Sequence, residues 1–247
     1  MATFHLFIIG DEILSGRRQD KHFAHILETL KKRGHKVAAA SYLPDDSAVL
    51  TEAFKRSLSA GQHVISCGGI GATPDDHTRL AFAKALGLPL SLHPEAAELI
   101  TTRFAEAAYP HRIQMAYFPT GSGLIPNPVN QVAGCFMQHH YLVPGFPSMA
   151  WPMLDWILDQ HYSDEAPEAT LSIVLLNARE GELIGVMQAF TTRYPQVGFS
   201  SLPSYGNELH PEPHIEFSIT AEPELAAEAM SYFQASLDAV LNSQAAK

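Results

Sequence analysis

Short apolar runs separated by amphipathic segments dominate the first two thirds of the sequence. Three of these runs, residues 4–10, 36–43 and 63–67, have the length and composition of buried strands. The segments that join them have helical patterns and short connections. Strand–helix alternation of this kind predicts right-handed crossovers and a mostly parallel α/β sheet.

The predicted helices have one apolar face. In residues 20–33, apolar side chains recur at intervals of three and four at Phe23, Ile26, Leu27 and Leu30. Gly34 follows as a plausible stop. Further helices are predicted from Asp45 or Asp46 to near Gly61, from the glycine-rich turn to Leu86, over 94–108 and over 148–160.

The sequence changes character after residue 116. Residues 117–147 are rich in proline and glycine and predict short strands, of which 141–143 returns to the sheet. A polar stretch over 163–169 predicts a linker. The remaining segments predict a small α/β unit, with strands at 170–177, 197–202 and 213–220 and helices at 180–193 and 222–241. We therefore expect a large domain over residues 1–162 and a small α/β domain over residues 168–247.

Composition and charge limit the classes of function. A hydrophobic content of 46% with 17% charged residues is ordinary for a globular protein, and a formal net charge of −10 argues against a nucleic-acid partner. No apolar run reaches the length of a membrane span, so no membrane partner is expected. The first twelve residues have no basic region and the two cysteines stand in unrelated contexts, which predicts a cytoplasmic location.

The most informative stretch is residues 64–79, where an apolar run ends in a glycine-rich turn followed by Asp75 and Asp76. Its glycines are Gly68, Gly69 and Gly71. Glycine lets main-chain amides approach a ligand closely, and the start of a helix favours anions. Carboxylates at the same place favour a metal ion, so this turn is a candidate site for a phosphate-bearing ligand held together with a divalent cation.

A structural interpretation of this turn stays open beside the functional one. The P-loop lysine is missing, and Pro74 stands where a dinucleotide fingerprint needs glycine. Thr73 and Asp76 have the spacing of a capping box and predict a helix start. A cap with spare carboxylate oxygens can still hold a metal, so the two interpretations are compatible.

Two more acidic pairs directly follow predicted strands. Asp11 and Glu12 follow the first strand, and Asp45 and Asp46 follow the second. Carboxyl ends of parallel strands lie at one edge of a sheet, where ligands bind, so we expect the acidic pairs to share that edge. Asp45 or Asp46 is equally suited to cap a helix. The thirteen histidines fit no zinc motif, and no nucleophile motif is present.

Five segments in this order resemble the molybdopterin-binding-domain family, which includes MoaB- and MogA-like proteins, and most closely its CinA-like, competence/damage-inducible branch. They are G-D-E-I-L-S-G-R (10–17), L-P-D-D (43–46), residues 68–79, residues 125–136 and V-P-G-F-P-S (143–148). The resemblance implies a three-layer α/β/α domain, the small domain that follows it in that branch, and a homo-oligomer, in the first instance a dimer. We do not expect the C-terminal deamidase domain of that branch.

The resemblance also implies a set of site residues. The implied ligand-binding residues are Ser15, Gly16, Gly68, Gly69, Gly71, Thr73, Pro144, Gly145, Pro147 and Ser148. The implied metal ligands are Asp11, Glu12, Asp45 and Asp76, with Asp45 and Asp76 also catalytic. The sequence departs from the family pattern at Lys21-His22, where Thr-Asn is common, and at Met149, where Glu is usual.

This resemblance implies a hydrolase, a metal-dependent pyrophosphatase that acts on ADP-ribose or FAD-like dinucleotides with Mg²⁺, Mn²⁺ or Co²⁺. Such an ion neutralises charge on the pyrophosphate, and main-chain amides hold its oxygens. Two alternatives stay open. One is a molybdopterin-binding protein of molybdenum-cofactor biosynthesis, whose ligand is a pterin phosphate. The other is a non-catalytic nucleotide-binding module.

Overall fold

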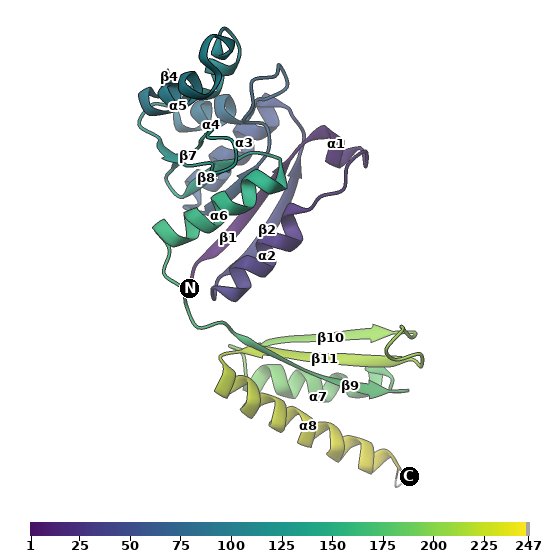
Figure 1. Ribbon diagram of the computed structural model, residues 1–247. Helices are drawn as coiled ribbons and strands as arrows, with labels where there is room; N and C mark the ends of the chain where they lie inside the picture. Colours follow the sequence, from purple (N-terminus) through teal and green to yellow (C-terminus); the bar gives the residue numbers. More distant parts are fainter. Residues whose placement is uncertain (246–247) are drawn as a thin grey trace. The chain divides into compact units, whose positions relative to one another are not determined.

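The computed structural model describes residues 1–245, and the chain divides into two compact units between Glu165 and Ala166 (Figure 1). This boundary falls within the linker that the sequence predicts over residues 163–169. Each unit has its own apolar core and is described by itself. Within residues 1–245 no helix is both long and apolar enough to cross a membrane.

The first unit is built on a six-stranded mixed sheet with the order β2-β1-β3-β8-β7-β6. Its parallel strands are β1 (Thr3–Ile9), β2 (Lys36–Leu43), β3 (His63–Cys67) and β8 (His140–Val143). The strands β6 (Gly123–Ile125) and β7 (Gly134–Met137) complete it in antiparallel register. The predicted α/β sheet is confirmed, with an antiparallel edge.

Helices cover both faces of this sheet and make three layers (Figure 1). One layer holds α2 (His22–Lys32) and α6 (Pro147–His161), and the other holds α3 (Ser47–Ser59), α4 (Thr78–Leu86) and α5 (Pro94–Phe104). The alternation of side chains along β1 serves both faces. Phe4 and Leu6 pack in the core beneath α2 and α6, and Phe7 and Ile9 pack in the core beneath α3, α4 and α5.

Short elements join the remaining chain of this unit. The four-residue helix α1 (Asp11–Leu14) follows β1, and β4 (Leu90–Leu92) pairs with β5 (Tyr117–Pro119) in a separate two-stranded sheet. The predicted helix over 94–108 ends earlier, at Phe104, and continues as the 3₁₀ turn η1 (Ala105–Ala108). A second 3₁₀ turn, η2 (Arg112–Ala116), leads into β5.

The two free cysteines are buried on opposite faces of this sheet. Cys67 of β3 packs in the core under α2 and α6, and Cys135 of β7 packs in the core under α3, α4 and α5. Burial raises the pKa of the Cys67 thiol and raises the pKa of the Cys135 thiol to about 12. Both side chains therefore behave as small apolar residues.

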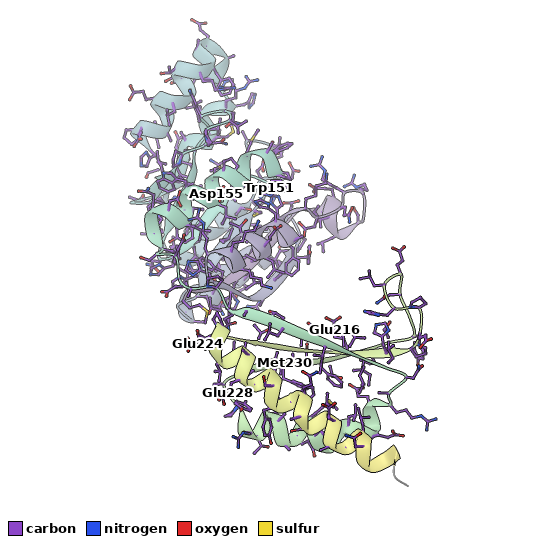
Figure 2. The ribbon with its side chains drawn as sticks, turned by 60° about the horizontal axis from the view of Figure 1, so that its bottom comes forward. Trp151, Asp155, Glu216, Glu224, Glu228 and Met230 are labelled. Carbon is purple, nitrogen blue, oxygen red and sulfur yellow. The ribbon has the colours of Figure 1, made fainter. Side chains whose placement is uncertain are left out.

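The second unit is a three-stranded antiparallel sheet with two helices on one face. The sheet order is β10-β11-β9, formed by β9 (Ala169–Leu176), β10 (Gly198–Ser204) and β11 (His214–Ala221). The helices are α7 (Glu180–Arg193) and α8 (Pro223–Ala245). Figure 2 shows Met230 of α8 and Glu216 of β11, which lie on opposite sides of the sheet because the neighbours of Glu216, Ile215 and Phe217, fill the core.

Candidate functional site

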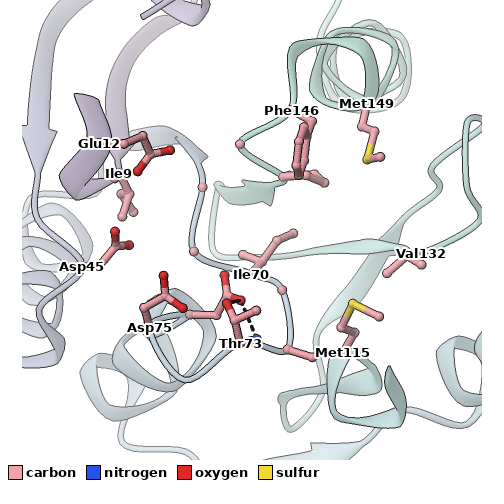
Figure 3. Close-up of a pocket in the computed structure, with 18 of the residues that line it drawn as sticks. Ile9, Glu12, Asp45, Ile70, Thr73, Asp75, Met115, Val132, Phe146 and Met149 are labelled. Atoms are coloured by element: carbon pink, nitrogen blue, oxygen red, sulfur yellow. Dashed lines mark hydrogen bonds between the residues drawn. The ribbon is translucent and has the colours of Figure 1, made fainter. Parts of the chain in front are cut away.

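A cavity of about 400 Å³ lies at the carboxyl ends of β1, β3 and β8, where ligands bind in sheets of this kind (Figure 3). The turn 68–73 runs along it. In Figure 3 the carboxylate side chains Glu12, Asp45 and Asp75 lie on one side of that turn. The apolar side chains Met115, Val132, Phe146 and Met149 lie on the other. The cavity therefore has a polar half and an apolar half, divided by the glycine-rich turn.

Two glycines of the turn have left-handed backbone conformations, with φ of 114° at Gly68 and 66° at Gly69. A methyl group at Gly68 would collide with the carbonyl oxygen of Ile9, and one at Gly69 would collide with the Thr78 hydroxyl. At Gly71 it would collide with the Asp76 carboxylate. The left-handed backbone and the tight packing behind the turn therefore require glycine at positions 68 and 69, whereas at Gly71 the obstacle is the end of the Asp76 side chain.

The start of α4 holds the carbonyl groups of this turn. Thr78 is fully buried, and its Oγ1 donates to the Gly68 carbonyl at 2.9 Å while its N–H donates to the Gly69 carbonyl at 3.0 Å. The guanidinium of the buried Arg79 donates to the Gly71 carbonyl. In the chain that the structure describes, the N–H groups of the residues from Gly69 to Ala72 donate no hydrogen bond.

Asp76 lines the cavity but does not cap α4. Its Oδ2 accepts from the Thr73 N–H at 2.8 Å and from the Thr73 hydroxyl at 2.5 Å. The predicted pairing of Thr73 with Asp76 is therefore present, but it closes a turn, and α4 begins at Thr78 after the cap residue His77. The predicted helix start at this box was wrong because four further residues are used to bring the Thr78 side chain under the glycines.

The second acidic pair divides two tasks between its members. Asp46 is the N-cap of α3, and its Oδ1 accepts from the N–H groups of Ala48 and Val49 at 2.8 and 2.9 Å. Asp45 instead lines the cavity, where its Oδ2 accepts from the Asp11 N–H at 3.0 Å. The Asp45 N–H donates to Asp11 Oδ1 at 3.3 Å, so the loops after β1 and β2 are joined reciprocally.

Negative charge accumulates in the polar half of the cavity. Burial raises the pKa of Asp45, and the nearby carboxylates of Asp11, Glu12 and Asp75 raise it further against the hydrogen bond from the Asp11 N–H. Arg18 also lines the cavity, and its Nη1 lies 3.8 Å from Oε1 of Glu12. Acidic groups therefore outnumber this cation at the edge of the site.

The arrangement of these carboxylates does not match a cation cage made by the protein alone. Within residues 1–245, no group of three or more histidine, cysteine, aspartate or glutamate side chains is placed to hold a metal ion. Asp11 and Asp45 are joined by hydrogen bonds from the main-chain N–H of each to the carboxylate of the other, and Asp11 does not line the cavity. The four expected metal ligands of the described chain therefore do not converge on one point. They are Asp11, Glu12, Asp45 and Asp76.

A second cavity of about 290 Å³ adjoins the first, and the two share Ile9, Glu12, Arg18, Gly145 and Phe146. Lys21 and His22, the two departures from the family pattern at the start of α2, line this second cavity. His22 is buried, and its Nε2 lies 3.0 Å from the Gly145 carbonyl oxygen. Because a carbonyl only accepts, Nε2 carries the proton and donates.

The sequence-predicted ligand residues fall into three groups. Those that line the first cavity are Gly68, Gly69, Gly71, Thr73, Pro144 and Gly145. Pro147 lines the second cavity. Ser15, Gly16 and Ser148 are exposed and line neither cavity. The Ser15 hydroxyl instead accepts from Arg17 Nε at 3.2 Å.

Sequence reasoning missed the apolar half of the cavity and the residues behind the turn. Met115 in η2, Val132 in a loop and Phe146 at the N-cap of α6 are ordinary apolar residues, and only the fold brings them together. The sequence did single out Met149, because this residue departs from the family pattern. It also included Thr78 and Arg79, since they close the recognised segment 68–79.

Comparisons with known proteins identify the family and the fold of the first unit. Residues 5–163 match the family described as probable molybdopterin binding domain. A protein of Pyrobaculum calidifontis is 29% identical over 213 residues, which are 82% of this chain and 81% of that protein. A CinA-like protein of Citrifermentans bemidjiense is 34% identical over 154 residues, which are 60% of this chain but only 37% of that protein. The crystal structure of a CinA protein of unknown function from Thermoplasma acidophilum is similar with a TM-score of 0.60 at 28% identity, covering 65% of this chain and 99% of that one.

Proposed function

The chain belongs to the molybdopterin-binding-domain family, and on that premise we propose that its first unit binds a phosphorylated pterin of the molybdopterin class. The phosphate lies on the main-chain amides of residues 69–72, and the pterin ring lies against the apolar half of the cavity. The observation that carries the proposal is the row of N–H groups without partners in the described chain, beside a cavity that is apolar on its other side.

Physical chemistry supports this division of the ligand. Successive backbone N–H groups in a turn with left-handed residues form a concave anion site. A flat heterocycle gains from contact with an aromatic ring and with the polarisable side chain of methionine, and Phe146 and Met149 supply both at the cavity. A volume of about 400 Å³ lies within the range usual for small-molecule sites.

Calorimetric titration with neopterin phosphate and with neopterin tests the proposal. The two probes differ only in the phosphate, so the ratio of their dissociation constants isolates its contribution. We expect the phosphorylated probe to bind about tenfold more tightly or better, because hydrogen bonds to a charged group contribute roughly 1.5–3 kcal/mol. Equal affinity for the two probes, or no binding of either, contradicts the proposal.

A second candidate function is the cleavage of a dinucleotide pyrophosphate such as ADP-ribose or FAD. Its support is the excess of carboxylates over cations beside the amide row, which a divalent cation bound with the substrate would offset. Since the described residues hold no three-ligand set, such a cation would take further ligands from the substrate phosphates and water.

Incubation with ADP-ribose or FAD and Mg²⁺, Mn²⁺ or Co²⁺ separates the candidates. Release of AMP by the wild type that is lost in Asp45→Asn and Asp76→Asn favours hydrolysis. A nucleotide that raises the melting temperature without turnover under any of the three metals favours a non-catalytic binding module.

A further inference from the structure

Arg79 is a buried cation directly behind the glycine-rich turn. Its side chain is 7% exposed, and its guanidinium donates to three main-chain carbonyls, those of Gly71, Gln114 and Tyr117. In the part of the chain that the structure describes, Arg79 has no ion pair with a carboxylate, and its Nε has no hydrogen-bond partner. Burial lowers the pKa of Arg79 and the nearby Asp76 carboxylate opposes this, although no carboxylate of the described residues lies within ion-pair distance, so main-chain carbonyls are the direct partners of this buried cation.

The hydrogen bonds of Arg79 and Thr78 fix the direction of the peptide groups in the turn. In a trans peptide the C=O of one residue and the N–H of the next point in opposite directions. The carbonyls of Gly68, Gly69 and Gly71 point toward Thr78 and Arg79. The N–H groups that follow them, on Gly69, Ile70 and Ala72, therefore point the other way.

The other side of the turn is the cavity. Residues from Gly68 to Thr73 line it, whereas Thr78 and Arg79 do not. Three carbonyls are thus withdrawn from the ligand side, where they would repel an anion, and three amide donors remain on it. This sorting depends on two adjacent residues at the start of α4.

We propose that Arg79, assisted by Thr78, is a positioning residue for the phosphate site: through its hydrogen bond to the Gly71 carbonyl it orients the amides of the turn toward the ligand. This inference rests on the proposed function of the cavity. Arg79 acts through the turn and does not itself touch the ligand, because it lies behind the residues that line the cavity.

A structural role for Arg79 makes a different prediction. Through Gln114 and Tyr117 the guanidinium also holds the segment that contains Met115, which lines the apolar half. If Arg79 only maintained the shape of the cavity, its loss would weaken neopterin and neopterin phosphate equally. A positioning role removes affinity selectively for the phosphorylated probe.

The experiment compares the ratio of dissociation constants for neopterin and neopterin phosphate among variants. Arg79→Met, which removes charge and donors, is expected to lower the wild-type preference for phosphate about tenfold, the effect of losing one hydrogen bond to a charged group. Arg79→Lys keeps the charge without the forked geometry and is expected to fall between the two.

Thr78 supplies a milder pair of variants in case Arg79→Met does not fold. Thr78→Val removes the donor to the Gly68 carbonyl at nearly constant shape and should lower the phosphate preference, whereas Thr78→Ser restores the hydroxyl and should retain it. In ¹⁵N-resolved NMR spectra, neopterin phosphate should shift the amide signals of Gly69, Ile70 and Ala72 in the wild type.

The possible outcomes separate the two proposals. If the wild type shows no preference for the phosphorylated probe, the proposed function fails and the role of Arg79 fails with it. If the wild type shows the preference and folded Arg79→Met and Thr78→Val proteins keep it, only the positioning role is overturned.

Discussion

Acidification below pH 6.5 is expected to destabilise the first unit through His140. This side chain is fully buried in β8, where its ring stacks on that of Phe82 and also contacts that of Phe54. Its Nδ1 lies 2.8 Å from the Gln138 carbonyl oxygen and therefore donates, and its Nε2 lies 2.8 Å from Ser57 Oγ and accepts. The neutral ring is satisfied at both nitrogens. A second proton on Nε2 would oblige Ser57 Oγ to accept and to turn its own proton to the Phe54 carbonyl at 3.0 Å, so the cost of protonation is chiefly the burial of the charge.

The size of the effect follows from the shift in the pKa of His140. Burial lowers this pKa from 6.5 to about 4, with smaller lowering by His139 and His63 and an opposing contribution from the Gln138 carbonyl. Between these two values the unfolded chain binds a proton that the folded chain excludes. The free energy of unfolding therefore falls as the pH falls through this window, by a total of about 3 kcal/mol below pH 4.

Urea unfolding followed by tryptophan fluorescence from pH 4 to pH 7.5 measures this loss. Both tryptophans, Trp151 and Trp156, belong to α6, so their fluorescence reports on the first unit. The variant His140→Gln keeps an amide donor and acceptor and should lose about 3 kcal/mol less than the wild type over this range. His111→Gln, at an exposed position, is the matched control. Parallel stability curves for wild type and His140→Gln would refute the reasoning.

Three further predictions concern the site. Asp45→Asn should raise the melting temperature, since burial and the neighbouring carboxylates disfavour the charge of Asp45, and it should abolish any AMP release. Asp46→Ala should lower the melting temperature, because it removes the cap of α3. Gly69→Ala should destabilise by about 1–2 kcal/mol or more in urea unfolding, because its backbone is left-handed and a methyl group collides with Thr78; unchanged stability would contradict the glycine requirement. Phe146→Ala, at a side chain 57% exposed, should change the free energy of unfolding by less than about 0.5 kcal/mol yet weaken neopterin binding in calorimetry; unaltered affinity would place the ring elsewhere.

Where a structural signal is local, the sequence predicted it well. The strand β3 was predicted at 63–67 with the observed bounds, because its apolar run is short and bounded by polar residues. The cap of α3 was narrowed to Asp45 or Asp46, and the structure assigns it to Asp46. The helix α4 ends at Leu86 as predicted, and Gly87 follows it in a left-handed conformation.

Non-local features were beyond the sequence pattern. The antiparallel pairing of β6 and β7 depends on partners that a short segment does not reveal. The turn closed by Thr73 and Asp76 has the same local signature as a helix cap, and only the packing of Thr78 under Gly69 decides where α4 begins. Ser15 at the end of α1 and Ser148 in the first turn of α6 lie away from the cavity because of the directions of these helices, which no residue pattern specifies.

One thiol is buried on each face of the sheet, so the two cysteines can report on partial opening of the first unit. An alkylating reagent such as iodoacetamide reacts with the thiolate, so neither Cys67 nor Cys135 will be modified at neutral pH while its layer stays closed. Cys67 also lines the second cavity, so its earlier modification would mean that this cavity opens or that α2 and α6 detach, whereas earlier modification of Cys135 would mean that the α3–α5 side opens first. Alkylation rates of the two cysteines, measured by mass spectrometry with and without a bound pterin, would thus show which face of the sheet the ligand stabilises.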